Sequence, residues 1–121
     1  MLWREELIPV NPFSRPGIPL RTVRKITMHY TANPGASAAN HVNYFGKVLP
    51  KQDPNDGKPD TYASAHLFVD KTEAVLVIPL NEVAYHAGPA NTYSIGVEMC
   101  IEEDGNFHPD TVERTAKIVA E

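Results

Sequence analysis

Residues 23–35, which read VRKITMHYTANPG, constrain the fold more than any other stretch of the chain. The alternation at its start predicts a β-strand over residues 23–30, and the Pro-Gly pair at its end predicts a turn. Thr27 and His29 then share one face of the strand, because successive side chains point to opposite faces. His29 lies near the C-terminal end, where open α/β sheets usually place their chemistry. The stretch therefore predicts a sheet with a site at its edge.

The rest of the chain alternates strand-like and helix-like segments, which is the pattern of an α/β domain. Further strands are predicted over residues 64–70, 74–79 and 94–101, and helices over residues 36–49 and from residue 109 onward. The first helix carries one apolar stripe, Ala38, Val42, Phe45 and Leu49. His41 lies beside this stripe, which is typical of a histidine at the boundary or surface of a helix.

Residues 1–22 are rich in proline and precede the first predicted strand. They predict an extended arm, with a short helical turn over residues 2–7. A free arm would expose Trp3 and Phe13 to water, so we expect it to pack against the domain formed by residues 23–121.

Composition limits the class of protein. The 121 residues suffice for one domain, and 42% hydrophobic with 21% charged residues is typical of a globular protein. A formal charge of -4 with scattered basic residues argues against a nucleic-acid partner. No apolar run reaches the ~18 residues of a membrane helix, so membrane insertion is not expected. Glu5 and Glu6 interrupt the region where a signal peptide has its apolar core, which predicts cytoplasmic synthesis without a cleaved leader.

Glu98 is a candidate for acid–base chemistry because it interrupts the apolar strand SIGVEMCI. Gly96 lies on the same face, and its missing side chain lets another group approach closely. In a cleft, loss of hydration would raise the pKa of Glu98 and suit it to accept a proton from a metal-bound water. A carboxylate that simply faces solvent fits the same pattern, and both interpretations remain open.

Three histidines accompany Glu98: His29, His66 in SAHLFVD and His86 in AYHAG. Each alone is more typical of a structural role, but together with a glutamate near strand ends they favour a site. Neither an HExxH helix nor a CxxC pair occurs, and no GxSxG elbow is present. Cys100 is the single cysteine, which excludes an internal disulfide, and a thiol within a strand is usually inert packing.

Four motifs, ITMHYTAN, SAHLFVD, LNEVAYHAG and SIGVEMC, occur in an order and spacing that resemble the type-2 N-acetylmuramoyl-L-alanine amidases. This family includes phage endolysins and bacterial autolysins and is related to peptidoglycan recognition proteins. The resemblance covers residue 23 to the end, and LIPVNPFSRPG resembles the endolysin branch. It implies a central mixed β-sheet flanked by helices. It also implies hydrolysis of the amide between N-acetylmuramic acid and L-alanine in peptidoglycan, on the bacterial cell wall after release.

The resemblance also implies roles for individual residues. It makes His29 a Zn²⁺ ligand and Glu98 the residue that assists the attacking water. His66, His86 and Tyr30 are placed by it along the substrate groove. Some relatives carry a tyrosine where this chain has Ala65, which leaves the proton transfer to Glu98.

The family takes its other zinc ligands, a histidine and then a cysteine or aspartate, from a segment after the second predicted helix. Residues 1–121 contain no such segment, so we expect a catalytic domain that is truncated at its C-terminus. Two other classes stay open. One is a peptidoglycan-binding module without catalysis, and the other is an inert fragment whose exposed apolar sheet surface a homodimer would cover.

Overall fold

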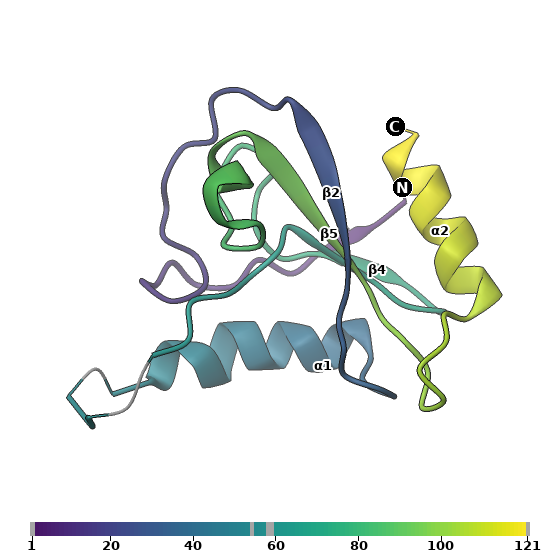
Figure 1. Ribbon diagram of the computed structural model, residues 1–121, viewed down its shortest axis with the longest axis horizontal. Coiled ribbons are helices and arrows are strands. Elements are labelled where there is room, and N and C mark those ends of the chain that lie inside the picture. The colour runs from purple at the N-terminus through teal and green to yellow at the C-terminus, as the bar shows by residue number, and fades with distance from the viewer. Residues whose placement is uncertain (1, 54, 58–59, 121) are drawn as a thin grey trace.

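The computed structural model describes residues 2–53, 55–57 and 60–120, and it contains one mixed β-sheet with a helix on each face (Figure 1). The strands are β1 (Arg4–Glu5), β2 (Lys25–Tyr30), β3 (Leu67–Val69), β4 (Ala74–Leu76) and β5 (Ser94–Met99), and the helices are α1 (Ala38–Asn43) and α2 (Pro109–Val119). The α/β class with a central mixed sheet, expected from the sequence, is confirmed.

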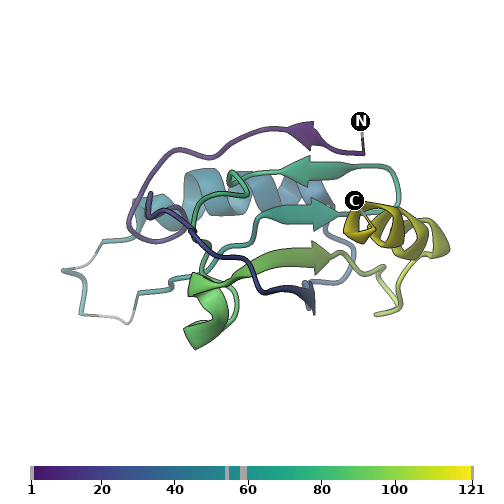
Figure 2. The same ribbon diagram turned by 90° about the horizontal axis from the view of Figure 1, so that it is seen from above.

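The order of the strands in the sheet is β1-β4-β3-β5-β2 (Figure 2). Among the described strands, β3 and β4 run antiparallel and form a hairpin, and the other neighbouring pairs are parallel. The last strand in the sequence, β5, therefore lies between β3 and the first long strand, β2. The register of β2 on β5 places Thr27 beside Gly96 and His29 beside Glu98.

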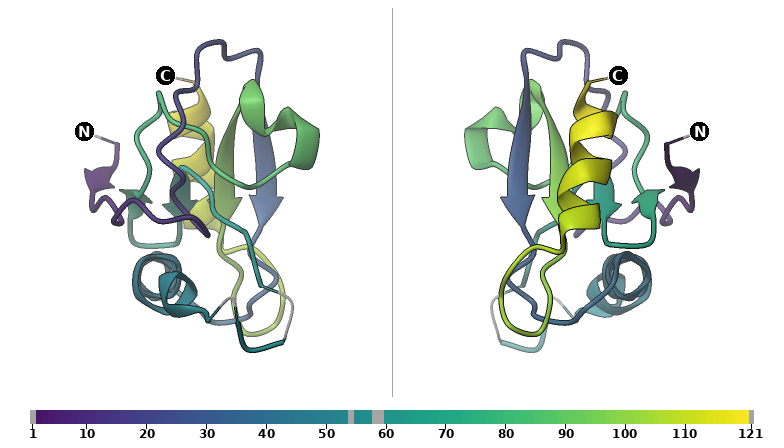
Figure 3. Two further views of the ribbon diagram at one scale, coloured as in Figure 1. Left: turned by 90° about the vertical axis from the view of Figure 1, so that its left-hand side faces the viewer. Right: turned by 90° about the vertical axis from the view of Figure 1, so that its right-hand side faces the viewer.

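The two helices cover opposite faces of the sheet (Figure 3). Phe68 of β3 packs with Ala38 and Val42 of α1 on one face. Its neighbours Leu67 and Val69 point the other way and pack with Ile118 of α2. The alternation of buried residues along β3 thus builds two separate apolar layers from three consecutive side chains.

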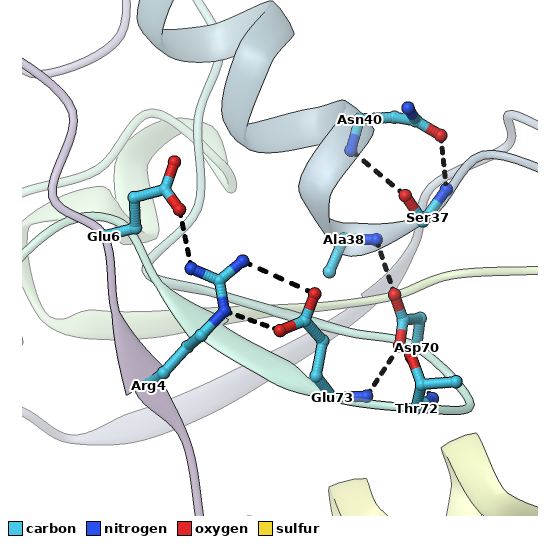
Figure 4. A network of polar contacts seen from close by, with 8 residues as sticks. All are labelled: Arg4, Glu6, Ser37, Ala38, Asn40, Asp70, Thr72 and Glu73. Carbon is cyan, nitrogen blue, oxygen red and sulfur yellow. Dashed lines mark hydrogen bonds and ion pairs between the residues drawn. The ribbon is translucent and has the colours of Figure 1, made fainter.

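Helix α1 begins with a capping box, in which two side chains each accept a backbone N–H from the other residue (Figure 4). The Ser37 hydroxyl accepts the backbone N–H of Asn40 at 3.1 Å, and the Asn40 side chain accepts the N–H of Ser37 at 2.9 Å. The α-helix is shorter than predicted: it continues as a π-helical turn, Tyr44–Val48, and a 3₁₀ turn, Leu49–Lys51. Within this helical segment, the stripe residues Ala38, Val42 and Leu49 are buried, and Phe45 is partly buried.

Asp70 directly follows β3, and its side chain links the end of this strand to α1 by hydrogen bonds (Figure 4). One carboxylate oxygen accepts the backbone N–H groups of Thr72 and Glu73 at 2.8 Å each, which closes the hairpin turn. The other oxygen accepts the N–H of Ala38, in the first turn of α1, at 2.8 Å. Strands β3 and β4 are shorter than the predicted segments 64–70 and 74–79. Backbone pairing still continues beyond them, since Val77 donates to the carbonyl of His66 at 2.9 Å.

The helical turn predicted over residues 2–7 is wrong, because this segment is strand β1. Arg4 and Glu5 pair in parallel with β4, and the N–H of Ile8 donates to the Val77 carbonyl at 3.0 Å. The open edge of β4 offers backbone partners that a short isolated helix lacks, so tertiary pairing overrides local preference. Ile8 and Phe13 are buried, and Ile8 fits against Gly46, where a Cβ would lie 2.9 Å from its Cγ2.

The α2 face of the sheet is only partly covered. A groove of about 220 Å³ runs beside the helix and is lined by Trp3, Ile26, Leu67, Leu80, Ile95, Val97, Ile118 and Val119. Ile26 and Met28 keep about two-fifths of their surface exposed, at 40% and 42%. None of the helices in the described part of the chain has the length and apolar character needed to cross a bilayer.

Candidate active site

His29 and Glu98 lie next to each other on parallel strands. They are direct partners in the register of β2 and β5, so alternation points both side chains to the same face of the sheet. Phe68 of β3 is the partner of Glu98 on its other side and packs toward α1. The histidine and the glutamate that the sequence singled out separately therefore lie side by side on one face of the sheet.

Glu98 is held in an environment that favours its protonated form. Burial raises the pKa of Glu98 from 4.5 to about 7. Within residues 2–53, 55–57 and 60–120, its Oε2 is buried and has no hydrogen-bond partner, a property shared with the Thr31 hydroxyl. A carboxylate with a pKa near neutrality and an unused oxygen is suited to accept a proton and to return it.

His29 uses one of its two ring nitrogens in a contact with His86. The distance from His29 Nε2 to His86 Nδ1 is 3.2 Å, and the two rings meet edge to face at 79°. Burial lowers the pKa of His29 below its ordinary 6.5, which favours the neutral imidazole that metal ions require. The other ring nitrogen of His29, Nδ1, remains available for a ligand.

His86 occupies the space that Gly96 leaves open. A Cβ at position 96 would lie 2.5 Å from His86 Cγ, so any larger residue would displace the ring. The close approach predicted from the glycine on the Glu98 face is confirmed. Burial, followed by the neighbouring His66, His29 and Lys25, lowers the pKa of His86 to about 4, so this ring is neutral at pH 7.

His66 holds β5 from the side of β3. The backbone N–H of Gly96 donates to His66 Nδ1 at 3.0 Å, and the Nε2–H of His66 donates to the Glu82 carbonyl at 2.6 Å. Burial lowers the pKa of His66, and its side chain is fully buried. His66 can therefore act on a bound molecule only through β5 and the ring of His86.

Tyr30 is not brought together with these residues. It follows His29 in β2, so its side chain points to the opposite face of the strand, and it is 61% exposed.

Cys100 and His41 are packing residues. Burial and the nearby carboxylates of Asp70, Glu98 and Glu102 raise the pKa of Cys100 to about 12, which keeps the thiol protonated. The placement of His41 at a helix boundary is wrong. It is buried, it stacks on Phe68 at 5.2 Å between ring centroids, and its Nδ1–H donates to the Ser37 carbonyl at 2.7 Å.

The chemistry of His29 and Glu98 fits one part of a metal site. A neutral imidazole nitrogen can coordinate a metal ion, and a buried carboxylate oxygen without a hydrogen-bond partner can accept a proton from a water molecule. Among the described residues, however, no cluster of three or more histidine, cysteine, aspartate or glutamate side chains is placed to hold a metal ion. Three protein ligands are usual for catalytic zinc, so these residues alone do not close a coordination set.

A hollow near the site lies beyond the strand ends rather than over His29. It has a volume of about 490 Å³ and is lined by Gly35, Ala36, Ser37, Asp70, Lys71, Thr72, Cys100, Glu102, Glu103 and Asp104. None of the three site histidines contributes to it. The strong pKa shift and the histidine contacts locate the chemistry more directly than this acidic hollow does.

Comparison with known proteins identifies the family. The sequence model described as N-acetylmuramoyl-L-alanine amidase matches residues 19–121. The chain belongs to the N-acetylmuramoyl-L-alanine amidase family. It is 48% identical over 134 residues to the amidase BlyA of Bacillus subtilis (strain 168), covering 94% of this chain and 34% of that protein. It is 44% identical over 129 residues to the amidase CwlL of Bacillus licheniformis, covering 97% and 34%.

Solved amidase-family structures share the fold. The catalytic domain of XlyA superposes with a TM-score of 0.75 at 36% identity, covering 96% of this chain and 71% of that domain. PlyL superposes with a TM-score of 0.72 at 25% identity, covering 98% and 70%. The chain thus spans about a third of the length of its curated amidase relatives and about seven-tenths of these solved structures.

Two features of the site were not anticipated from the sequence. The contact between His29 and His86 joins residues far apart in the chain, and only the glycine at position 96 hinted at it. The buried hydroxyl of Thr31, two residues beyond His29, had no distinguishing signal, because threonine is common at strand ends.

Proposed function

We propose that this amidase-family chain carries part of a catalytic centre that hydrolyses the amide between the lactyl group of N-acetylmuramic acid and L-alanine in peptidoglycan. The observation that carries the proposal is the pairing of His29 with Glu98, whose pKa of about 7 suits proton transfer at neutral pH. The names of the relatives supply the bond and the polymer. Bacterial cell wall is accordingly the proposed place of action.

Zn²⁺ is the proposed cofactor, and His29 is the ligand that this chain would contribute. Bound zinc would polarise the scissile carbonyl and lower the pKa of a water molecule. The family resemblance assigns the other ligands to a segment that these residues do not contain. His86 contacts His29, and the ring of His66 in turn meets the ring of His86.

Glu98 does the proton transfer in the proposed reaction. Its unpartnered Oε2 accepts a proton from the attacking water, and the carboxylic acid then donates it to the nitrogen that leaves with L-alanine. A group whose pKa lies near the working pH performs both steps efficiently. The products are a free lactyl carboxyl group and a new amino terminus.

A second candidate is a peptidoglycan-binding module without hydrolysis. The observation that favours it is the incomplete set of metal-binding side chains within the described residues. Such a module would retain the sheet face around His29 and Glu98 but would leave the amide intact.

The test is incubation of purified cell walls and Zn²⁺ with a form of the protein that also carries the segment to which the family resemblance assigns the other zinc ligands. Under the proposal, new amino groups appear without new reducing ends. Glu98→Gln reduces the rate at which amino groups are released by a factor of about 100 or more. Glu113→Gln, on the exposed surface of α2, is the matched control and keeps the activity. New reducing ends, or full activity in Glu98→Gln, would overturn the proposal. Wall binding without release of amino groups would replace it by the second candidate.

A further inference from the structure

Residues 11–15 of the N-terminal arm form a turn that is closed by its own hydrogen bonds. The N–H of Asn11 donates to the Arg15 carbonyl at 2.7 Å, and Asn11 Oδ1 accepts the N–H groups of Phe13 and Ser14 at 2.9 Å each. An asparagine side chain that accepts backbone N–H groups two and three residues on stabilises such a turn. The arm turn, residues 11–15, therefore fixes the backbone from which Arg15 extends. It precedes residue 19, where the match to the amidase model begins.

Arg15 binds the loop that follows β4. Its Nε and Nη2 donate to the two carboxylate oxygens of Glu82 at 2.9 Å each, and both side chains are largely buried. A backbone bond continues this contact, because the N–H of Val83 donates to the Ile18 carbonyl at 2.8 Å. A guanidinium that binds a carboxylate through two parallel bonds restricts both groups more than a single contact does. The arm therefore sets the position of the Glu82 backbone.

His66 connects the Glu82 backbone to β5. Its Nε2–H donates to the Glu82 carbonyl at 2.6 Å, and its Nδ1 accepts the N–H of Gly96 at 3.0 Å. The side chain of His66 is fully buried, so a shift of the loop would leave a buried polar group without a partner at one end of this connection. Gly96 lies on β5, two residues before Glu98. The arm–β5 linkage (Arg15, Glu82, His66 and Gly96) thus ends beside the proposed base.

The arm turn also reaches a strand that neighbours Glu98. The Ser14 hydroxyl donates to the Phe45 carbonyl, in the π-helical turn, at 2.6 Å. The ring of Phe45 stacks on Phe68 with 5.3 Å between ring centroids, and Phe68 is the register partner of Glu98 on β3. Adjacent residues of the arm turn therefore contact the surroundings of Glu98 from two directions.

We propose that the arm turn positions β5, and with it Glu98, through the arm–β5 linkage. Arg15 and His66 are positioning residues, because they act on the strand rather than on a substrate. A fixed point at Gly96 is effective, since glycine has no side chain of its own to hold the strand in place. The linkage stands on its contacts alone, whereas its purpose in catalysis rests on the proposed role of Glu98 in proton transfer.

The first experiment is amide hydrogen exchange, followed by NMR, in the whole chain. Arg15→Lys breaks the paired contact with Glu82, so the Gly96 N–H should exchange about 10-fold faster relative to a reference amide. The reference is the N–H of Cys100, which directly follows β5 and donates to the Val69 carbonyl at 2.8 Å. An equal acceleration at Gly96 and Cys100 would indicate a general loss of stability and would overturn the proposal.

Two further variants test the route. Arg4→Lys is the matched control, because Arg4 ties the same arm to the β3–β4 hairpin through Glu73, and it should leave the exchange ratio unchanged (Figure 4). Glu82→Gln weakens the contact with Arg15 from its other side. The double variant Arg15→Lys/Glu82→Gln should therefore change the ratio by less than the product of the two single changes. An effect of Arg4→Lys as large as that of Arg15→Lys, or independent effects of Arg15 and Glu82, would count against the linkage.

Kinetics connects the linkage with the proposed function. In the form of the protein that also carries the segment with the other expected zinc ligands, Arg15→Lys should lower kcat for the release of amino groups about 3–10-fold. The KM for cell walls should stay the same, since Arg15 does not bind the substrate. A raised KM with an unchanged kcat would overturn the positioning of Glu98. If Glu98→Gln keeps full activity while Arg15→Lys still accelerates exchange selectively at Gly96, the proposed function fails and the linkage of the arm to β5 stands.

Discussion

His29 and Glu98 face the same side of the sheet as register partners on two parallel strands, β2 and β5. No single local motif contains both residues, since they come from two strands that are far apart in the sequence. The pairing lets the sheet itself fix the spacing between a proposed ligand and a proposed base. Strands hold such geometry more tightly than loops do.

Glu98→Gln should make stability less dependent on pH. The folded-state pKa of about 7 exceeds the ordinary value of 4.5, so wild-type stability is greatest below pH 4.5 and falls as the pH rises through 7. The variant lacks this loss and should be more stable by about 1–2 kcal/mol at pH 8, with allowance for partial exposure, and similar at pH 4. Urea unfolding at both pH values measures the difference. Equal differences at pH 4 and pH 8 would contradict the raised pKa.

Asp70→Asn should destabilise the junction of α1 with the β3–β4 hairpin. Burial raises the pKa of Asp70, but hydrogen bonds from Ala38, Thr72 and Glu73 outweigh it, and the net pKa lies below 3.8. The amide group would set a donor against the N–H of one partner, at a cost of about 2–3 kcal/mol near pH 7.

The same change should remove part of the acid sensitivity. Because the folded pKa of Asp70 is lowered, its contribution is present above pH 3.8 and is lost as the pH falls below it. Denaturant midpoints from pH 7 to pH 2 measure this loss. Asp104→Asn is the control, since Asp104 is exposed and accepts the Asn106 N–H in its own turn. Equal effects of the two variants would contradict a special role for Asp70.

Gly96→Ala should disturb the site through His86. The added Cβ would lie 2.5 Å from the ring, and overpacking of this kind typically costs about 1–3 kcal/mol. The double variant Gly96→Ala/His86→Ala lacks the clash. Its loss of stability should therefore be smaller than the sum of the losses in the two single variants. Thermal unfolding of the four proteins of this cycle measures the coupling. Strict additivity would show that the ring does not occupy the glycine space.

Arg15→Lys should loosen the N-terminal arm. Arg15 binds Glu82 through two parallel 2.9 Å contacts and donates to the Ile8 carbonyl at 2.7 Å. A lysine ammonium cannot reproduce this fork, so we expect a loss of about 1–2 kcal/mol. Proteolysis of the arm and urea unfolding measure the effect. The matched control is Arg21→Lys, on an exposed side chain, and equal behaviour of the two variants would speak against the fork.

Sequence patterns predicted the elements whose signals are local. The alternation around His29 and Glu98 gave the correct faces of β2 and β5, and the stripe from Ala38 to Leu49 gave the buried side of the first helical segment. The segment before residue 8 failed because its structure depends on the open edge of β4, which no local pattern reveals. The four motifs that resemble the amidases supplied the family, and the comparisons confirm it.

Side-chain contacts between distant segments could not be predicted from the sequence to the same extent. Gly96 signalled that some group approaches β5, but the sequence did not identify that group as His86. His41 was misplaced because a histidine beside an apolar stripe looks like a boundary residue until Phe68 is known to stack on it. The same holds for Asp70, whose three backbone partners come from two segments that only the fold brings together.

The strand order also sets the sequence of events during synthesis. In the described sheet, β2 is bonded only to β5, so the first strand to carry a site residue has no neighbour until the fifth strand inserts beside it. A chain emerging from the ribosome can form the β3–β4 hairpin early, because those contacts are close in sequence. Strand β2, which carries His29, cannot pair until residues 94–99 have been synthesised. The site is thus the last part of the sheet to assemble, and an unfinished chain has no means of presenting it.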